Sequence, residues 1–184
     1  MKVLGISGSL RRDSHNTKVL RAAAELLPTG VELELWDGLQ DVPPYNEDDE
    51  ARPPAAVTDL RETIAGADAL LISTPEYNSS FPGALKNALD WASRPRETAA
   101  LRNKPVAVVG ASTGAFGAVW AQADLRKVLS AAGARVVEGE VAVGHAHERF
   151  DEVGRLTDEN LLEQLGEIVD TLVAEVRPAV PVAA

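Results

Sequence analysis

The chain has 184 residues, of which 45% are hydrophobic and 25% charged, and its formal net charge is −10. The length and composition are typical of one globular domain, and the acidity, without any Lys/Arg cluster, argues against nucleic acid or anionic membranes as partners. The absence of cysteine excludes disulfides, thiolate metal sites and a cysteine nucleophile.

The first third of the chain alternates strand and helix patterns. A strand is predicted at 2–7, too close to the N-terminus for a signal peptide. Because no stretch reaches the roughly 20 apolar residues of a membrane span, we expect a cytoplasmic protein. A helix is predicted at 16–27. The strand predicted at 31–36 alternates Val or Leu with Glu, as at the edge of a sheet. A polar loop at 37–54 and a helix at 55–65 follow.

The rest of the chain continues the pattern. Further strands are predicted at 69–74, 105–110 and 135–143, and further helices at 83–92, 115–132 and 158–176. The strand at 105–110 contains an uninterrupted run of Val and Ala and is placed at the centre of the sheet. Residues 1–176 are expected to form a single domain, and residues 177–184, with two prolines, a disordered tail.

Strict alternation of strands and helices is the signature of βαβ units and a parallel sheet. Five strands and five helices indicate a three-layer α/β/α sandwich. Because the second strand looks peripheral and the third and fourth look buried, we expect the flavodoxin-like strand order 2-1-3-4-5. Ligands of such folds bind at the carboxyl ends of the strands, so the loops that follow the strands are the candidate site.

The loop after the first strand, residues 7–17, has the composition of a phosphate site. Gly8 permits a tight turn, and the helix start offers free N–H groups and a positive dipole end. Polar donors surround it, namely Ser9, Arg11, Arg12, Ser14, Asn16 and Thr17. Helix capping alone would explain only one of them. The loop matches neither the dinucleotide nor the P-loop glycine motif, so we predict a phosphate monoester outside those two classes.

Two more loops follow central strands. Residues 75–81 carry short polar groups able to bracket the edge of a flat heteroaromatic ring, although Tyr77 alone would also suit an interface or the rim of the core. Residues 110–117 are rich in glycine, which permits close backbone approach to a ligand or simply tighter helix–sheet packing. Taken together, the three loops predict a mononucleotide site.

These segments resemble the NADPH-dependent FMN reductases, a family that includes chromate, quinone and azo-dye reductases. The resemblance rests on Gly8-Ser9-Leu10-Arg11 with Ser14 and Asn16, on Pro43-Pro44-Tyr45-Asn46, on residues 75–91 and on Ser112-Thr113-Gly114. It extends in order over about residues 1–175. The match over residues 75–91 is the most specific.

The resemblance implies a flavodoxin-like fold, bound FMN, a homodimer or homotetramer, and NADPH or NADH as reductant. It places Ser9, Arg11, Ser14, Asn16, Thr17 and the amide of His15 on the FMN phosphate, and Pro75, Glu76, Tyr77, Asn78, Ser112, Thr113 and Gly114 along the isoalloxazine. The flavin carries the redox chemistry, so no catalytic side chain is required. The expected reaction passes hydride from NAD(P)H through FMN to quinone, azo, metal-oxyanion or free flavin acceptors.

Other interpretations remain open. A flavodoxin-type electron carrier without NAD(P)H oxidase activity suits the acidity, but Arg11 and a helix ending at Asp90-Trp91, which is expected to face another subunit, argue against it. A regulator that binds a sugar phosphate or mononucleotide is a third possibility. Residues 145–148, with two histidines, and the acidic residues 47–50 are interpreted as solvated, and Tyr45-Asn46 as bordering the active site.

Overall fold

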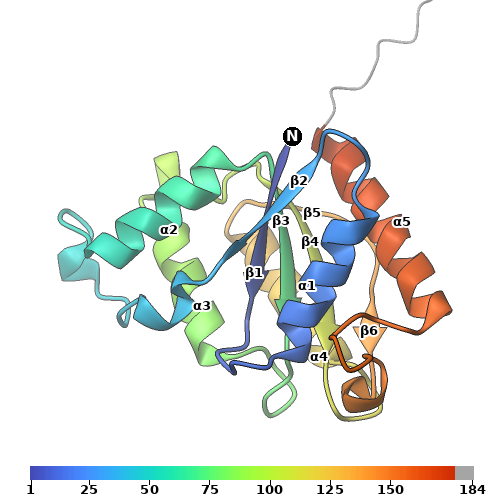
Figure 1. Ribbon diagram of the computed structural model, residues 1–184. Coiled ribbons are helices and arrows are strands. Elements are labelled where there is room, and N and C mark those ends of the chain that lie inside the picture. The colour runs from blue at the N-terminus through green and yellow to red at the C-terminus, as the bar shows by residue number, and fades with distance from the viewer. Residues whose placement is uncertain (177–184) are drawn as a thin grey trace, which may run out of the picture.

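The computed structural model describes residues 1–176, so the tail predicted to be disordered, 177–184, lies outside the described residues. The sheet is parallel, with the order β2-β1-β3-β4-β5 and a short β6 paired with β4 (Figure 1). The predicted strand order is confirmed. The strands are β1 (Lys2–Ser7), β2 (Glu32–Trp36), β3 (Ala69–Thr74), β4 (Pro105–Ala111), β5 (Arg135–Val136) and β6 (Ala142–Val143).

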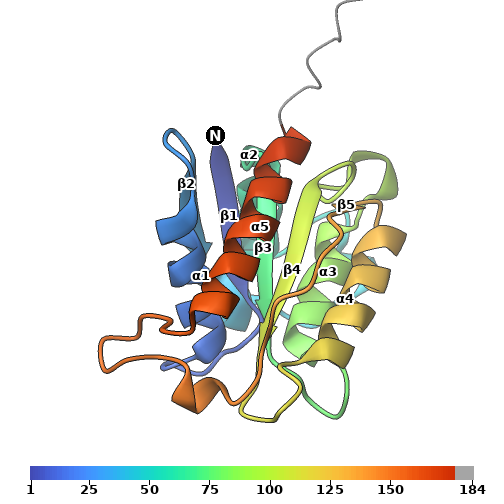
Figure 2. The same ribbon diagram turned by 90° about the vertical axis from the view of Figure 1, so that its right-hand side faces the viewer.

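Helices cover both faces of the sheet, with α1 and α5 on one side and α2, α3 and α4 on the other (Figure 2). They are α1 (His15–Leu26), α2 (Ala55–Gly66), α3 (Gly83–Ala92), α4 (Val119–Ala131) and α5 (Glu159–Val176). Short 3-10 turns lie at Gly38–Asp41, Glu47–Asp49, Arg96–Thr98 and Ala146–Glu148. No helix within residues 1–176 is both long and apolar enough to cross a membrane.

The register of the central strands divides their side chains between two cores. Leu4 pairs with Leu70 and Leu70 with Val106, and all three face α2, α3 and α4. Neighbouring residues alternate to the opposite face, where Val3 and Ala107 contact the core under α1 and α5. Every residue of β3 and β4 is buried, whereas β2 buries none. The edge position predicted for the second strand is therefore confirmed.

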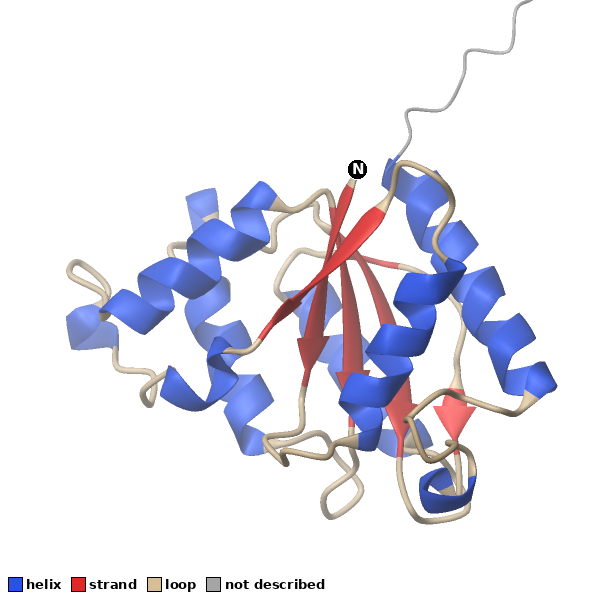
Figure 3. Ribbon diagram, viewed as in Figure 1, coloured by secondary structure: helices blue, strands red, loops and turns tan. Residues whose placement is uncertain are grey.

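The sheet brings the three predicted loops to one edge. The carboxyl ends of β1, β3 and β4 are in register, with Ser7 opposite Ser73 and Thr74 opposite Gly110. The loops that leave these ends gather at the lower edge in Figure 3. Three segments that are spread over about 100 residues of the chain thus come together because their strands are hydrogen-bonded neighbours.

Two predicted elements were wrong in extent. The strand predicted over 135–143 is broken into β5 and β6, because Gly139 takes a φ of +125° between them. The fourth helix begins at Val119 rather than Ala115, because Gly117 and Ala118 have φ angles of +57° and +66°. This left-handed backbone cannot start a helix and keeps the third loop irregular up to residue 118.

The prediction that the end of α3 faces another subunit was wrong at Trp91. Its side chain is fully buried, its ring meets that of Tyr45 edge to face at 4.9 Å, and its Nε1 donates to the Pro43 carbonyl at 2.9 Å. Asn87 donates to the same carbonyl at 2.8 Å. The Pro43–Asn46 motif therefore anchors the long 37–54 loop onto α3.

Candidate functional site

A pocket of about 200 Å³ lies where the three loops meet. It is lined by Ser9, Arg11, Ser14, His15, Asn16, Pro75, Glu76, Tyr77, Ala111, Ser112 and Thr113. All but Ala111 belong to the predicted site. Thr17, Asn78 and Gly114 were also predicted to bind the cofactor, but they do not line this pocket, and their contact with FMN stays a prediction. Tyr45 and Asn46 do not line this pocket either, contrary to the expectation that they border the active site.

One end of the pocket has the properties of an anion site. Ser14 caps α1, and its Oγ accepts the Asn16 N–H at 3.1 Å. No acidic residue occupies the first turn, and the first N–H groups of a helix have no partner within it. The exposed Arg11 guanidinium makes no hydrogen bond or ion pair within residues 1–176. A helix dipole and an unpaired guanidinium together favour a phosphate dianion.

Asn16 connects this end to the sheet. Its Oδ1 accepts from the Ser73 hydroxyl at 2.8 Å and from the Ala111 N–H at 3.0 Å, while its Nδ2 donates to the Ala111 carbonyl at 3.0 Å. The side chain is 3% exposed. Its amide is therefore committed to positioning α1 against β3 and β4. Asn16 lines the pocket, its predicted contact with the FMN phosphate stays a prediction, and the sequence did not reveal this positioning role.

His15 forms part of the same wall and is held by a residue that the sequence did not reveal. Its ring stacks on Phe150, with centroids 5.7 Å apart and planes 17° apart. Its Nδ1 is buried without a hydrogen-bond partner among the described residues. Burial first, and then the charges of Arg11 and Lys18, lower the pKa of His15 below its usual value. A neutral imidazole therefore lies beside the anion end at neutral pH.

The second loop is a tight hairpin. Tyr77 and Ser80 exchange backbone hydrogen bonds of 2.8 and 3.1 Å, and between them Asn78 and Ser79 have φ angles of +51° and +62°. Positive φ at both central residues is the geometry of a type I′ turn, which asparagine tolerates well. The turn projects the Tyr77 side chain, 54% exposed, at the mouth of the pocket.

Glu76 ties the second loop to the third. Its Oε2 accepts the N–H groups of Trp120 and Ala121 at 3.1 and 3.2 Å, both in the first turn of α4. Ala118, the residue that precedes α4, offers no side-chain cap, so the carboxylate of a distant loop supplies one and complements the helix dipole. Glu76 thereby sets the spacing between two walls of the pocket.

The third loop is supported by residues 142–146, which sequence reasoning missed. The Ser112 N–H donates to the Val143 carbonyl at 3.1 Å, and the Ser112 carbonyl accepts the Ala146 N–H at 3.0 Å. At Gly144 the two segments pass so closely that a Cβ there would lie 2.2 Å from the Ala115 carbonyl oxygen. In the sequence, the only indication of this contact was Gly144 itself, which directly follows the strand predicted at 135–143.

The pocket thus joins an anion end, formed by the first loop and α1, to walls formed by the second and third loops. That arrangement suits a flat ring linked to a phosphate. Within residues 1–176, no three His, Asp or Glu side chains are grouped as they would be to hold a metal ion. The site can therefore bind and orient a planar phosphorylated group, and its chemistry would come from that group.

Comparisons with known proteins agree with this geometry. A family model described as NADPH-dependent FMN reductase matches residues 1–148. An NAD(P)H-dependent FMN reductase of Pseudomonas aeruginosa is 46% identical over 179 residues, covering 96% of each chain. A 2-hydroxy-1,4-benzoquinone reductase of a Burkholderia species is 38% identical over 178 residues, covering 96% of this chain and 97% of its own.

A solved structure has the same fold over nearly the whole chain. FerB of Paracoccus denitrificans, a flavoenzyme NAD(P)H:(acceptor) oxidoreductase, superimposes with a TM-score of 0.83 at 36% identity. The alignment covers 95% of this chain and 96% of FerB.

Proposed function

This chain belongs to the NADPH-dependent FMN reductase family, and from that premise we propose that the pocket between its three loops binds FMN. It is an FMN-dependent NAD(P)H oxidoreductase. What remains to be proposed is which residues hold the cofactor and which acceptors are used. We also propose that residues 1–176 act as a single FMN-binding domain.

The phosphate of FMN is assigned to the first loop. The observation that carries this assignment is the unpaired Arg11 guanidinium beside the start of α1, where the Ser14 cap accepts only the Asn16 N–H. Ser9 and Ser14 line the same end and add hydroxyl groups. Asn16 keeps the loop in position through β3 and β4.

The isoalloxazine is assigned to the second and third loops. Bound FMN would accept hydride from NAD(P)H and pass reducing equivalents to an acceptor. The backbone N–H groups of Glu76, Asn78 and Thr113, which make no hydrogen bond within residues 1–176, would orient the ring and stabilise negative charge on it. The negative charge of the Glu76 carboxylate is itself paired with N–H groups at the start of α4.

We propose quinones as the principal acceptors, with azo compounds, metal oxyanions and free flavins as further ones. The support is that several relatives are named quinone reductases, including one of Pseudomonas putida that is 43% identical over 155 residues. The relatives and structural neighbours described above are named as reductases and oxidoreductases, and nothing among them favours an electron carrier.

The visible spectrum of the purified protein tests this function. We expect flavin absorbance that bleaches when NADPH is added without oxygen and returns when a quinone is added. Both half-reactions are then seen in one cuvette. A protein that takes up no FMN would contradict the pocket assignment, and flavin that is bound but not reduced by NADPH or NADH would contradict the reductase activity.

We further propose that the protein is a homodimer or homotetramer that works in the cytoplasm, where NAD(P)H is available. Support for self-association comes from Phe116 and Trp120, which are 63% and 47% exposed and meet edge to face at 5.0 Å beside the pocket. Exposed apolar pairs of this kind commonly mark interfaces. Cell fractionation tests the location.

Light scattering tests the assembly. The wild-type mass should be at least twice 19.5 kDa, and the double variant Phe116→Ser with Trp120→Ser should shift toward the monomer. Val153→Ser is the control, because Val153 is a 74% exposed apolar residue that is not part of the aromatic pair. A monomeric wild type, or an equal shift in the control, would contradict this interface.

A further inference from the structure

The three histidines of the chain lie at the edge of the sheet that carries the pocket. His15 begins α1 and lines the pocket itself. His145 donates its N–H to the Gly114 carbonyl of the third loop at 2.9 Å, and its ring lies 6.4 Å from that of His147. Histidine is the side chain whose ordinary pKa lies closest to neutral pH. The side chains that most readily change charge near neutral pH are thus gathered beside the predicted phosphate end.

The ring of His15 is held against the protein but is open to a ligand at one nitrogen. It stacks on Phe150 at 5.7 Å, and its Nδ1 is buried without a hydrogen-bond partner among the described residues. Its Nε2 is not buried in this way, and it too makes no hydrogen bond within residues 1–176. Because His15 lines the pocket, Nε2 is the ring nitrogen that a bound group can reach.

The charges that face His15 leave it in a positive surrounding. They come from the first loop, from α1 and from the segment after β6, and they belong to Arg11, Asp13, Lys18 and His147. Asp13 pairs with Lys18 at 2.8 Å, and the exposed His147 pairs with its neighbouring glutamate at 3.1 Å. Arg11 has no ion pair within the described residues. Burial, and then this unpaired charge, lower the pKa of His15 and keep the ring neutral.

A phosphate at the start of α1 would reverse this balance. The cationic form of the ring carries an N–H on both nitrogens, and the protein offers it no unpaired negative charge. A phosphate dianion brings that charge to the end of the pocket that His15 lines, and a nearby opposite charge favours the ionised form. Because linkage between two binding events is reciprocal, the added proton would in turn strengthen the hold on the phosphate.

We propose that the His15 ring takes up a proton from solvent when FMN binds and donates its Nε2–H to the phosphate as a charged group. The inference rests on the proposed function, which places the phosphate at the first loop, and it gives the side chain a role where the resemblance implied only the amide. The affinity that His15 contributes is complete below the pKa of the ring in the free protein. It is lost as the pH rises through the higher pKa of the ring in the complex.

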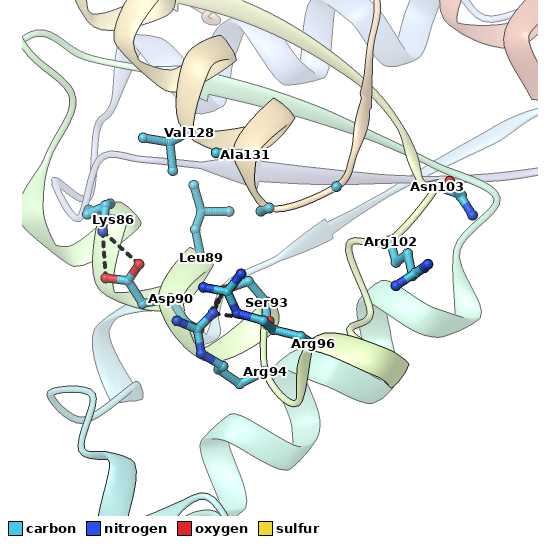
Figure 4. Close-up of a pocket in the computed structure, with 12 residues that line it drawn as sticks. Lys86, Leu89, Asp90, Ser93, Arg94, Arg96, Arg102, Asn103, Val128 and Ala131 are labelled. Atoms are coloured by element: carbon cyan, nitrogen blue, oxygen red, sulfur yellow. Dashed lines mark hydrogen bonds and ion pairs between the residues drawn. The ribbon is translucent and has the colours of Figure 1, made fainter.

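A cavity of about 550 Å³ between α3 and α4 is a contrasting cationic region. Its positive groups, shown in Figure 4, are Lys86, Arg94, Arg96 and Arg102. No histidine lines it within residues 1–176, and lysine and arginine stay charged well above neutral pH. A phosphate held there would therefore bind without proton uptake by the protein. The pH dependence proposed for His15 thus distinguishes the pocket from this cavity as the place where the phosphate binds.

The dissociation constant of FMN tests the inference in the wild type and in His15→Gln, which keeps a neutral donor but cannot titrate. FMN-loaded protein is diluted, and the flavin fluorescence that returns measures the released cofactor. At about pH 6 the variant should bind FMN about five- to tenfold more weakly, because charged hydrogen bonds are stronger than neutral ones. At about pH 8.5 the two proteins should agree within about twofold, because the ring is then neutral. The phosphate, with a second pKa of about 6, titrates alike in both, so its effect cancels in the comparison.

His145→Asn is the matched control. It removes a histidine from the same edge at a position that does not line the pocket, and asparagine tolerates the φ of +49° found there. Its FMN affinity should follow that of the wild type at both pH values. A ratio between His15→Gln and wild type that is the same at both pH values would mean that His15 acts only by packing, and an equal effect in the control would mean a general charge effect. Either result would overturn the inference.

NMR titration of the histidine rings supplies an independent readout in the wild type. The signal of His15 is identified by its absence from His15→Gln. Its pKa should be higher in the FMN-loaded protein than in the flavin-free protein, and an unchanged or lower pKa would overturn the inference. A wild type that binds no FMN at any pH would overturn the proposed function as well, whereas bound FMN without a change in the titration of His15 would overturn this inference alone.

Discussion

The variant Arg11→Ala is expected to bind FMN about 10- to 150-fold more weakly than the wild type. A hydrogen bond to a charged group contributes about 1.5–3 kcal/mol, which converts to that range of affinity. Arg11 lines the anion end of the pocket and has no competing partner within residues 1–176, so its charge is available to the phosphate. Titration of the apoprotein with FMN, followed by quenching of flavin fluorescence, measures the change.

The adjacent Arg12 provides a matched control. It is also exposed, but it does not line the pocket. Arg12→Ala removes the same charge one residue away, and its FMN affinity should stay within about threefold of wild type, because exposed charges contribute little. Equal losses in the two variants would indicate general electrostatic attraction, and an unchanged affinity in Arg11→Ala would refute the phosphate assignment.

The variant Asn16→Ala is expected to lose about 2–5 kcal/mol of folding stability. The substitution leaves the Ala111 N–H, the Ala111 carbonyl and the Ser73 hydroxyl without their partner in a buried environment. Each buried unsatisfied group costs about 1–3 kcal/mol. Water that enters the space left by the side chain can bond to some of these groups, so we expect a total cost below the sum for all three. Urea unfolding of the apoprotein measures the loss as a lower midpoint at an unchanged slope.

Thr17→Ala provides the control for this experiment. Thr17 follows Asn16 in α1 and is only half-buried, and its hydroxyl makes no hydrogen bond within residues 1–176. Thr17→Ala should therefore lower the free energy of unfolding by less than about 1 kcal/mol. If Asn16→Ala were no more destabilising than Thr17→Ala, the bridge from α1 to β3 and β4 would not be a major contributor to stability.

Local patterns predicted most of the fold. The bounds of β3 and α3 agree with the prediction, and the strand order is the predicted one. These elements have strong local signals, namely uninterrupted apolar runs for buried strands and an apolar face of helical period. The errors lie at 135–143 and at the start of α4, where backbone with positive φ at Gly139, Gly117 and Ala118 overrides the pattern. A non-glycine residue such as Ala118 gives no local warning of such a conformation.

Residue type also predicted which positions line the pocket but not what each side chain does there. Asn16 looked like a phosphate ligand, yet its amide is bonded to Ser73 and Ala111. Glu76 looked like a ring contact, yet its carboxylate caps α4. Trp91 looked like a subunit contact, yet it is buried beside Tyr45. In each case the partner lies far away in the chain, so no local pattern could name it.

By itself the sequence determined the class of fold, the three loops at one edge and the family, because these depend on apolar periodicity and on motifs carried by consecutive residues. Only the tertiary structure decided how those loops are held: Asn16 by the sheet, the third loop by the glycine at residue 144, and His15 by Phe150. It alone brought Arg96 and Arg102 to one cavity with α4. Contacts between distant segments depend on how helices pack across the sheet, and the order of residues along the chain does not encode that packing locally.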